Sequence, residues 1–280
     1  MRRDVLAAAS GLWRELPWRA TRDPWHVLVS EVMLQQTQAS RVVEPYLRFT
    51  QRFPTPAACA AAPSGEAVRA WAGLGYNRRA VRLHEAAAAI TAAHGGVVPA
   101  SLPALRALPG VGPYTARAVL AFAFEVPTGV VDVNVARVLS RALGGAPLSP
   151  RAAQELADRL VPSAAAWGFN QALFDIGAQV CSARHPACER CPLLRRCRWA
   201  RAGKPVPDPG APRGRQSAFE GSHRQGRGRL VGALRARPLH LDEIAQAAGW
   251  PDEAARARAA AHSLVRDGIA RWEGDVLTLD

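Results

Sequence analysis

Four cysteines lie close together past the middle of the chain, and they constrain the fold more than any other feature. Cys181, Cys188, Cys191 and Cys197 are separated by six, two and five residues. One compact loop of this length brings four thiolates onto one metal centre, and soft thiolates favour an iron–sulfur cluster or zinc. Structural zinc sites usually use two separated C-x₂-C pairs, whereas only Cys188 and Cys191 form such a pair. Zinc and two disulfides are the alternatives.

The charge of the chain points to a polyanionic partner. Its 280 residues carry a formal net charge of +13, which favours nucleic acid, although a GC-rich genome also produces arginine-rich proteins. Lys204 is the only lysine, so every other basic residue except histidine is an arginine. No uncharged apolar run reaches membrane-spanning length, so we expect a cytoplasmic protein with no membrane partner. Cys59 lies in an alanine-rich stretch and is expected to be buried.

Two helical stretches are joined by residues 108–116, LPGVGPYTA. Gly110 and Gly112 permit positive φ and leave no side chain to block close approach. The amides that begin the next helix then point outwards, ready for an anion. The pattern predicts an anion site, with a plain corner between two helices as the alternative.

Several further strings complete a recognisable pattern. Residues 30–38 are SEVMLQQTQ, preceded by LPWR at 16–19, and WAGLGY and FNQA occupy 71–76 and 169–172. With the hairpin and the cysteine spacing, residues 10–200 resemble the MutY family of adenine DNA glycosylases, within the endonuclease III superfamily of helix-hairpin-helix DNA glycosylases. The resemblance implies a mostly α-helical, two-domain fold, a [4Fe–4S] cluster on the four cysteines, and base excision repair of DNA.

The chemistry of the implied reaction requires two carboxyl groups. Cleavage of a purine N-glycosidic bond leaves electron density on the base and positive charge on the sugar, so the site needs an acid and an anion. By resemblance, Glu31 protonates adenine N7 and helps to activate water, Asp132 stabilises the oxocarbenium-like sugar or bonds to it transiently, and Asn134 helps to position the water. From the pattern alone, Glu31 could lie on a solvated helix face and Asp132 could be a helix N-cap, which is compatible with catalysis.

Tyr114 bears on strand cleavage. The bifunctional endonuclease III branch has a lysine at this position, which forms a Schiff base that leads to strand cleavage. Tyr114 lacks an amine, and Lys204 lies far along the chain. We therefore expect a monofunctional glycosylase, with the N-terminal amine as a weak exception.

The target base must leave the duplex, because its reacting atoms are inaccessible in a stack. On the family pattern, the adenine pocket is lined by Arg14, Trp18, Arg19, Leu34 and Gln171. The residues expected to enter the duplex or contact the opposite base are Gln36, Thr37, Leu74 and Tyr76. The hairpin residues expected to contact the DNA backbone are Gly110, Val111 and Gly112. Trp18 and Leu34 fit core positions equally well.

The last quarter of the chain departs from the long members of the family. Those members carry a domain that senses 8-oxoguanine, whereas the pattern after residue 226 predicts three short helices and a hairpin around Gly274, as in a small winged helix. The helical core positions are Leu230, Leu234, Ile244, Ala248, Leu264 and Ile269. Val133 and Asn77 also differ from the residues common in the family, so a preference for 8-oxoguanine does not follow.

The expected organisation has four parts. Residues 1–20 and 130–200 form an iron–sulfur cluster domain, and 21–129 form a six-helix helix-hairpin-helix domain. Residues 201–225 form a basic, proline-containing linker, either a solvated tether or a strap along DNA, and 226–280 form the winged-helix-like domain.

The preferred function is excision of adenine mispaired with 8-oxoguanine or guanine in double-stranded DNA, by a cytoplasmic, nucleoid-associated monomer. A thymine or uracil mismatch glycosylase opposite guanine is the close alternative, since such relatives also carry tyrosine at the hairpin. Gln171 and Glu31 favour a purine. A redox-sensing DNA-binding regulator would explain the cluster and the charge, but it leaves Glu31 and Asp132 unexplained.

Overall fold

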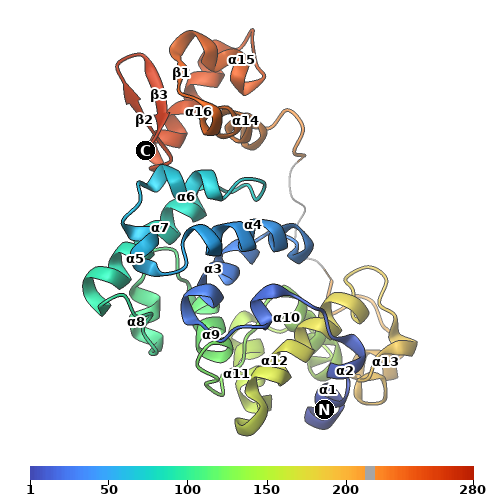
Figure 1. The fold of residues 1–280 in the computed structure, drawn as a ribbon. Coiled ribbons are helices and arrows are strands. Elements are labelled where there is room, and N and C mark those ends of the chain that lie inside the picture. Colours follow the sequence, from blue (N-terminus) through green and yellow to red (C-terminus); the bar gives the residue numbers. More distant parts are fainter. Residues whose placement is uncertain (212–217) are drawn as a thin grey trace. The chain divides into compact units, whose positions relative to one another are not determined.

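The computed structural model describes residues 1–211 and 218–280, which form two compact units. The first comprises Met1–Val27, Ala100–Leu102 and residues 112–211; the second comprises Leu28–Pro99, Pro103–Val111 and residues 218–280. The predicted mostly α-helical fold is confirmed, because the described residues form helices and loops apart from one small sheet (Figure 1). None of the described helices has the length and apolar character needed to cross a membrane.

The first unit is built from short helices. Its α-helices are α1 (Arg2–Ala7), α2 (Ala9–Leu12), α9 (Pro113–Phe122), α10 (Val133–Leu139), α11 (Pro150–Leu160), α12 (Ala166–Asp175) and α13 (Arg198–Arg201). Single 3₁₀ turns cover Pro17–Arg19, Ser163–Ala165, Cys188–Arg190 and Leu194–Arg196, and π-helical turns cover Ser140–Gly144 and Ile176–Val180. Side-chain caps begin two helices: Asp132 accepts from the Val135 amide, and Ser149 accepts from the Ala152 amide.

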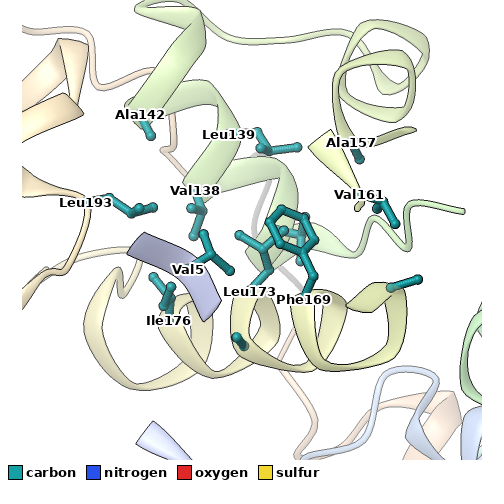
Figure 2. Packing of buried hydrophobic residues seen from close by; sticks show 13 residues of the cluster. Val5, Val138, Leu139, Ala142, Ala157, Val161, Phe169, Leu173, Ile176 and Leu193 are labelled. Carbon is teal, nitrogen blue, oxygen red and sulfur yellow. The ribbon is translucent and has the colours of Figure 1, made fainter. Parts of the chain in front are cut away.

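The core of the first unit joins α10 and α12. Each helix presents an apolar stripe at the spacing of a helical face, and the members are Val135, Val138 and Leu139 on α10 and Phe169, Ala172 and Leu173 on α12. Figure 2 shows these helices contributing to one cluster with Val5 of α1 and Leu193 of the cysteine loop. The loop that carries the cysteines is therefore anchored in the same core as the helix that Asp132 caps.

The second unit contains the remaining elements. Its α-helices are α4 (Ala39–Arg52), α5 (Pro56–Ala60), α6 (Ser64–Ala70), α7 (Arg78–His94), α14 (His223–Ala236), α15 (Ile244–Ala248) and α16 (Ala254–Arg266). Helices α3 (Pro24–Leu34) and α8 (Leu102–Ala107) begin in the first unit and continue in the second. Cys59 of α5 is buried as predicted, and burial raises the pKa of its thiol to about 12.

Residues 218–280 form the predicted winged-helix-like fold. The six apolar positions expected in its core are all buried. Strand β3 (Val276–Leu279) pairs antiparallel with β2 (Ala270–Glu273), and Gly274 with φ +60° lies in the turn between them. Strand β1 (Leu239–His240) pairs with the other edge of β3, which gives the order β1-β3-β2. With only two residues, β1 has no alternation that a sequence pattern would reveal.

Part of the predicted basic linker packs within the first unit, so the prediction of a solvated tether is wrong there. The Asp208 carboxylate accepts a hydrogen bond of 2.9 Å from Arg141 Nε. Gly210 is buried, and a Cβ there would lie 2.5 Å from Arg137 Cγ. The physical reason is that a buried guanidinium needs a counter-charge, and the linker supplies it. Residues 212–217, which include Arg213 and Arg215 of the predicted linker, lie outside the described residues.

Candidate active site and cysteine loop

The four predicted cysteine ligands line one cavity in the first unit. Cys181, Cys188, Cys191 and Cys197 share it with apolar side chains, which are Val180, Pro186, Leu194, Trp199 and Ala200. The chain reaches this cavity through a π-helical turn after α12 and two 3₁₀ turns that place the last three cysteines. Among the described residues, no group of three or more His, Cys, Asp or Glu side chains is placed to hold a single metal ion.

Arg141 binds the beginning of the cysteine loop. Its guanidinium donates to the carbonyl oxygens of Ser182 and Ala183 at 2.7 and 2.9 Å, and to Cys181 Sγ at 3.4 Å. Cys197 Sγ lies 3.4 Å from the Arg141 carbonyl oxygen. Burial opposes the charge of Arg141, but Asp208 and Cys181 hold its pKa above the usual range. Arg141, in the π-helical turn that follows α10, therefore contacts both ends of the cysteine loop.

Asp132 is fixed by two donors at the start of α10. Its Oδ1 accepts from the Val135 amide at 2.7 Å, and its Oδ2 accepts from Asn134 Nδ2 at 2.8 Å. The predicted helix N-cap is therefore present, and the carboxylate is half-buried. Asn134 and Asp132, both predicted site residues, are in direct contact.

A chain of hydrogen bonds continues from Asp132 to the cysteine loop. Arg137 Nη2 donates to Asn134 Oδ1 at 2.7 Å, and Arg137 Nε donates to the Cys181 carbonyl oxygen at 2.6 Å. Burial lowers the pKa of Arg137, although Cys181 and Asp132 act in the opposite direction. Gly177 is required beside it, because a Cβ there would lie 2.9 Å from Asn134 Cβ. The predicted catalytic carboxylate and the predicted cluster ligand are thus joined through two side chains.

Two predicted pocket residues, Arg14 and Arg19, bind a carboxylate that the sequence did not predict. Arg19 makes a bidentate ion pair with Asp175, at 2.9 and 3.0 Å, and Arg14 donates to the same carboxylate. Gln171 lies one helical turn before Asp175 on α12 and is also buried. Asp175 is fully buried, and Trp18 is buried as well. A single charged residue on an otherwise uncharged, mostly apolar helix was the available signal for Asp175.

Glu31 belongs to the second unit. Its side chain is 4 % exposed, in α3, beside the buried residues Leu28 and Val32. The alternative of a solvated-face glutamate is therefore wrong. Leu34 at the end of α3 is half-buried.

The predicted opposite-base residues lie on two turns of the second unit that share one arginine. Arg79 donates to the Met33 carbonyl at 2.8 Å, to Thr37 Oγ1 at 3.1 Å and to the Gly75 carbonyl at 3.2 Å. Gln36, which precedes Thr37, and Tyr76, which follows Gly75, both have positive φ, +56° and +47°.

The exposure of these opposite-base residues differs. Tyr76 is 40 % exposed, whereas Leu74 is 3 % exposed, so of these two residues Tyr76 is the one on the surface. Gln36 is exposed and Thr37 is half-buried. No pattern in the sequence shows that Arg79, and not the adjacent Arg78, is the less exposed of the two.

The hairpin has the predicted glycine geometry. Gly110 has φ +75°, and a Cβ there would lie 2.8 Å from Arg82 Cβ, so both its conformation and its surroundings exclude a side chain. Val111 is buried, while Gly112 is exposed and extended at the start of α9. Tyr114 lies in the first turn of α9 and is half-buried.

Comparisons with known proteins agree with this geometry. Residues 29–163 match the family model described as HhH-GPD superfamily base excision DNA repair protein. A protein of Mycobacterium tuberculosis named adenine DNA glycosylase is 44 % identical over 262 residues, which cover 91 % of this chain and 85 % of that protein.

Two solved structures are similar in fold. One is a thermostable thymine-DNA glycosylase, with a TM-score of 0.69 and 34 % identity over 72 % of this chain and 95 % of that chain. The other is a trapped endonuclease III–DNA covalent intermediate, with a TM-score of 0.61 and 25 % identity over 72 % of this chain and 98 % of that chain. The extent of the first relative's similarity decides the family: this chain belongs to the adenine DNA glycosylases of the HhH-GPD superfamily, and it is a DNA N-glycosylase of base excision repair.

Proposed function

We propose that this chain removes adenine mispaired with 8-oxoguanine or guanine from double-stranded DNA, and that it does not cleave the strand. The observation that carries the proposal is the fixed position of the Asp132 carboxylate. Two donors already fix its carboxylate, and the chain of contacts through Asn134 and Arg137 prevents it from turning away. A preorganised anion stabilises a developing positive charge without the cost of reorganising at the moment of reaction.

Glu31 is the proposed acid. Departure of adenine is easier once N7 carries a proton, because the leaving group is then neutral. A buried side chain on a rigid helix can hold that proton out of contact with bulk water, and Glu31 in α3 meets this description. After the base has left, the resulting carboxylate takes a proton from the attacking water.

Asp132 is the proposed stabiliser of the sugar. As the N-glycosidic bond breaks, positive charge develops at the anomeric carbon, and a carboxylate offsets that charge. Asn134 Nδ2 donates to Asp132 Oδ2, which leaves the amide well placed to hold the water nucleophile beside it. Asn134 therefore has both an orienting role for Asp132 and a positioning role for water.

The absence of strand cleavage follows from the residue types. A Schiff base needs an uncharged amine in the site, and Tyr114 supplies only a phenol. Lys204 is exposed and is the only lysine of the chain. Strand scission should then need alkali, added after the base has been removed.

The four cysteines are the proposed ligands of a [4Fe–4S] cluster. Burial raises the pKa of Cys191 to about 11, and the charges of Cys181, Cys188 and Cys197 act in the same direction. Four thiolates can therefore share this cavity only with cations between them. A cluster binds one thiolate at each iron, so it suits four cysteines that line one cavity but are not placed around a single ion. When bound, it would cross-link the loop and so support Arg137 and Asp132.

The remaining parts of the proposal concern binding. The adenine pocket would be lined by Arg14, Trp18, Arg19, Leu34 and Gln171, and the hairpin around Gly110 would contact the DNA backbone.

We also propose that the chain has the domain division expected from the sequence, that it is a monomer, and that it associates with the nucleoid. Light scattering of the purified chain, alone and with one duplex, tests the stoichiometry.

Thymine opposite guanine is the second candidate substrate, because a thymine-DNA glycosylase is among the similar solved structures. Single-turnover cleavage decides between the two on duplexes that contain A opposite 8-oxoguanine, A opposite G, or T opposite G, each with and without alkali. Alkali-dependent cleavage at A supports the proposal. Cleavage only at T replaces it with the second candidate, and cleavage without alkali contradicts the monofunctional assignment.

Two matched variants identify the chemistry. Glu31→Gln keeps the shape of the side chain but cannot donate a proton as an acid, so turnover should fall by about 10²–10⁴-fold while duplex binding persists. Glu125→Gln is the control, because Glu125 is an exposed surface residue whose ion pair with Arg22 is also exposed. Equal loss in both variants would contradict the role of Glu31.

A further inference from the structure

The winged-helix-like domain contacts the turn that carries Tyr76. Arg235, near the end of α14, donates from Nη2 to Asn77 Oδ1 at 2.9 Å and from Nε to the Val68 carbonyl at 3.1 Å. Arg235 is half-buried, and burial lowers the pKa of its guanidinium. Both acceptors are uncharged, so the hydrogen bonds to them offset part of the cost of taking this cation out of water.

Asn77 is used in an unusual way. It occupies the N-cap position of α7, where an asparagine side chain normally accepts a hydrogen bond from the helix. Here its backbone is helical, with φ −59°, and its side chain makes no cap bond; Oδ1 instead accepts a hydrogen bond from Arg235. The side chain at this position therefore connects two parts of the second unit and does not stabilise its own helix.

The turn before Asn77 needs outside support. Gly73, Gly75 and Tyr76 have φ of +91°, +67° and +47°, and this left-handed conformation is unfavourable for tyrosine. Arg79 binds the Gly75 carbonyl on one side of Tyr76, and Arg235 binds Asn77 on the other. Tyr76 is thus the exposed residue between two anchored neighbours.

Further contacts make the connection firm. Arg78 Nη1 lies 3.5 Å from an Asp267 carboxylate oxygen, and a Cβ on Gly268 would lie 3.6 Å from Val81 Cγ1. The Gly65 amide of α6 donates to the Asp280 carbonyl oxygen. These contacts join α7 to the end of α16 and α6 to the residue after β3, so the winged-helix-like domain is attached to this part of the second unit at several points besides Arg235.

We propose that the winged-helix-like domain braces the Tyr76 turn through Arg235, and that this brace sets how strongly the enzyme distinguishes 8-oxoguanine from guanine opposite the adenine. The inference rests on the proposed function and on the family pattern, by which Tyr76 is expected to enter the duplex or contact the opposite base. Arg235 is a positioning residue: it acts on the base only through Asn77 and the turn.

The first test uses the full chain without DNA. Hydrogen exchange of the Gly75, Tyr76 and Asn77 amides is measured in the wild type, Arg235→Met and Asn77→Ala. We expect about tenfold faster exchange in both variants, since each removes the same bond, and no further increase in the double variant. Arg237→Met is the control, because among the described residues the Arg237 side chain donates to Glu243 and to the Pro238 carbonyl, both within its own domain.

The second test uses single-turnover rates on A opposite 8-oxoguanine and on A opposite G. We expect the ratio of the two rates to fall about five- to tenfold in Arg235→Met and Asn77→Ala, and to stay unchanged in Arg237→Met. Asn77→Ala leaves the winged-helix-like domain intact, so it keeps the test valid if Arg235→Met fails to fold.

The outcomes separate the two proposals. Unchanged exchange of the turn in both variants would overturn the brace, and faster exchange with an unchanged rate ratio would overturn its role in discrimination. If the wild type cleaves no adenine duplex, the proposed function fails, while the exchange experiment still decides whether the domain supports the turn.

Discussion

Two arginines, the buried Arg141 in the first unit and the half-buried Arg79 in the second, have the same structural role with different partners. Arg141 donates to two carbonyl oxygens of the cysteine loop and pairs with Asp208. Arg79 donates to carbonyl oxygens of two turns that carry predicted DNA-contacting residues. Within residues 1–211 and 218–280, no ion pair joins Arg79 to a carboxylate.

The pKa values of the two guanidinium groups are shifted in opposite directions, because Arg141 has acidic partners. Burial lowers the pKa of Arg79 to about 10, with Tyr76 acting in the opposite direction. The same burial acts on Arg141, but Asp208 and Cys181 outweigh it and raise its pKa. Both guanidinium groups are charged at neutral pH. Loss of Arg141 would leave a carboxylate without its counter-charge, whereas loss of Arg79 would leave only neutral dipoles.

Arg141→Met should have the largest effect on stability. The substitution removes the buried guanidinium, leaves the half-buried Asp208 carboxylate unpaired and takes the donor from the Ser182 and Ala183 carbonyls, which together should cost about 3–5 kcal/mol. Denaturant unfolding of the full chain, with the visible absorption of the proposed cluster as a second probe, measures the loss. We expect the cluster signal to disappear at a lower denaturant concentration than in the wild type.

A second substitution sharpens this prediction. In the Arg141→Met background, Asp208→Asn removes the unpaired charge, so it should recover about 1–2 kcal/mol. A double variant no more stable than Arg141→Met would show that the counter-charge is not the source of the large effect.

Arg79→Met should cost less, about 2–3 kcal/mol, because the carbonyls that lose their donor are neutral. Arg79→Lys should recover little of this loss, since an ammonium group does not reproduce the planar fork that reaches both turns. Hydrogen exchange of residues 33–37 and 74–76 should rise in both variants, with no change in the cluster signal. A cost equal to that of Arg141→Met would break the comparison.

The sequence predicts the helices and the glycine turns well because their causes are local. The spacing of Leu230, Leu234 and Ile244 defines buried faces, and Gly110 and Gly274 adopt the left-handed angles that glycine alone tolerates at little cost. The linker was predicted less well, because the packing of Asp208 against Arg141 depends on residues far apart in the chain.

The same distinction holds for the candidate site. Glu31, Asp132 and the four cysteines belong to recognisable strings, so they can be proposed from the sequence. Asp175, Arg79 and Arg235 cannot, because each is one acidic or basic residue among many and gains its role from distant partners. Thirty-five arginines are indistinguishable in a sequence of this composition until the structure shows which are buried.

The smallest predicted effect is the acid response of Asp208. The hydrogen bond from Arg141 holds the pKa of this carboxyl below its usual value of 3.8. The ionised group therefore stabilises the folded chain above about pH 4, and this contribution is lost as pH falls through the lower, folded-state pKa. Asp208→Asn should cost about 1 kcal/mol at neutral pH and nothing in strong acid, so its stability curve should converge with that of the wild type.

Arg79→Met is the control. Its stability curve should run parallel to that of the wild type over the same pH range, since Arg79 has no carboxylate partner among the described residues to titrate. Exchange of the amides of residues 177–183, near neutral pH and near pH 3, reports on the first unit alone. Convergence in both variants would mean that acid weakens the whole molecule and not this ion pair, and the contrast between the two arginines would then lose its electrostatic basis.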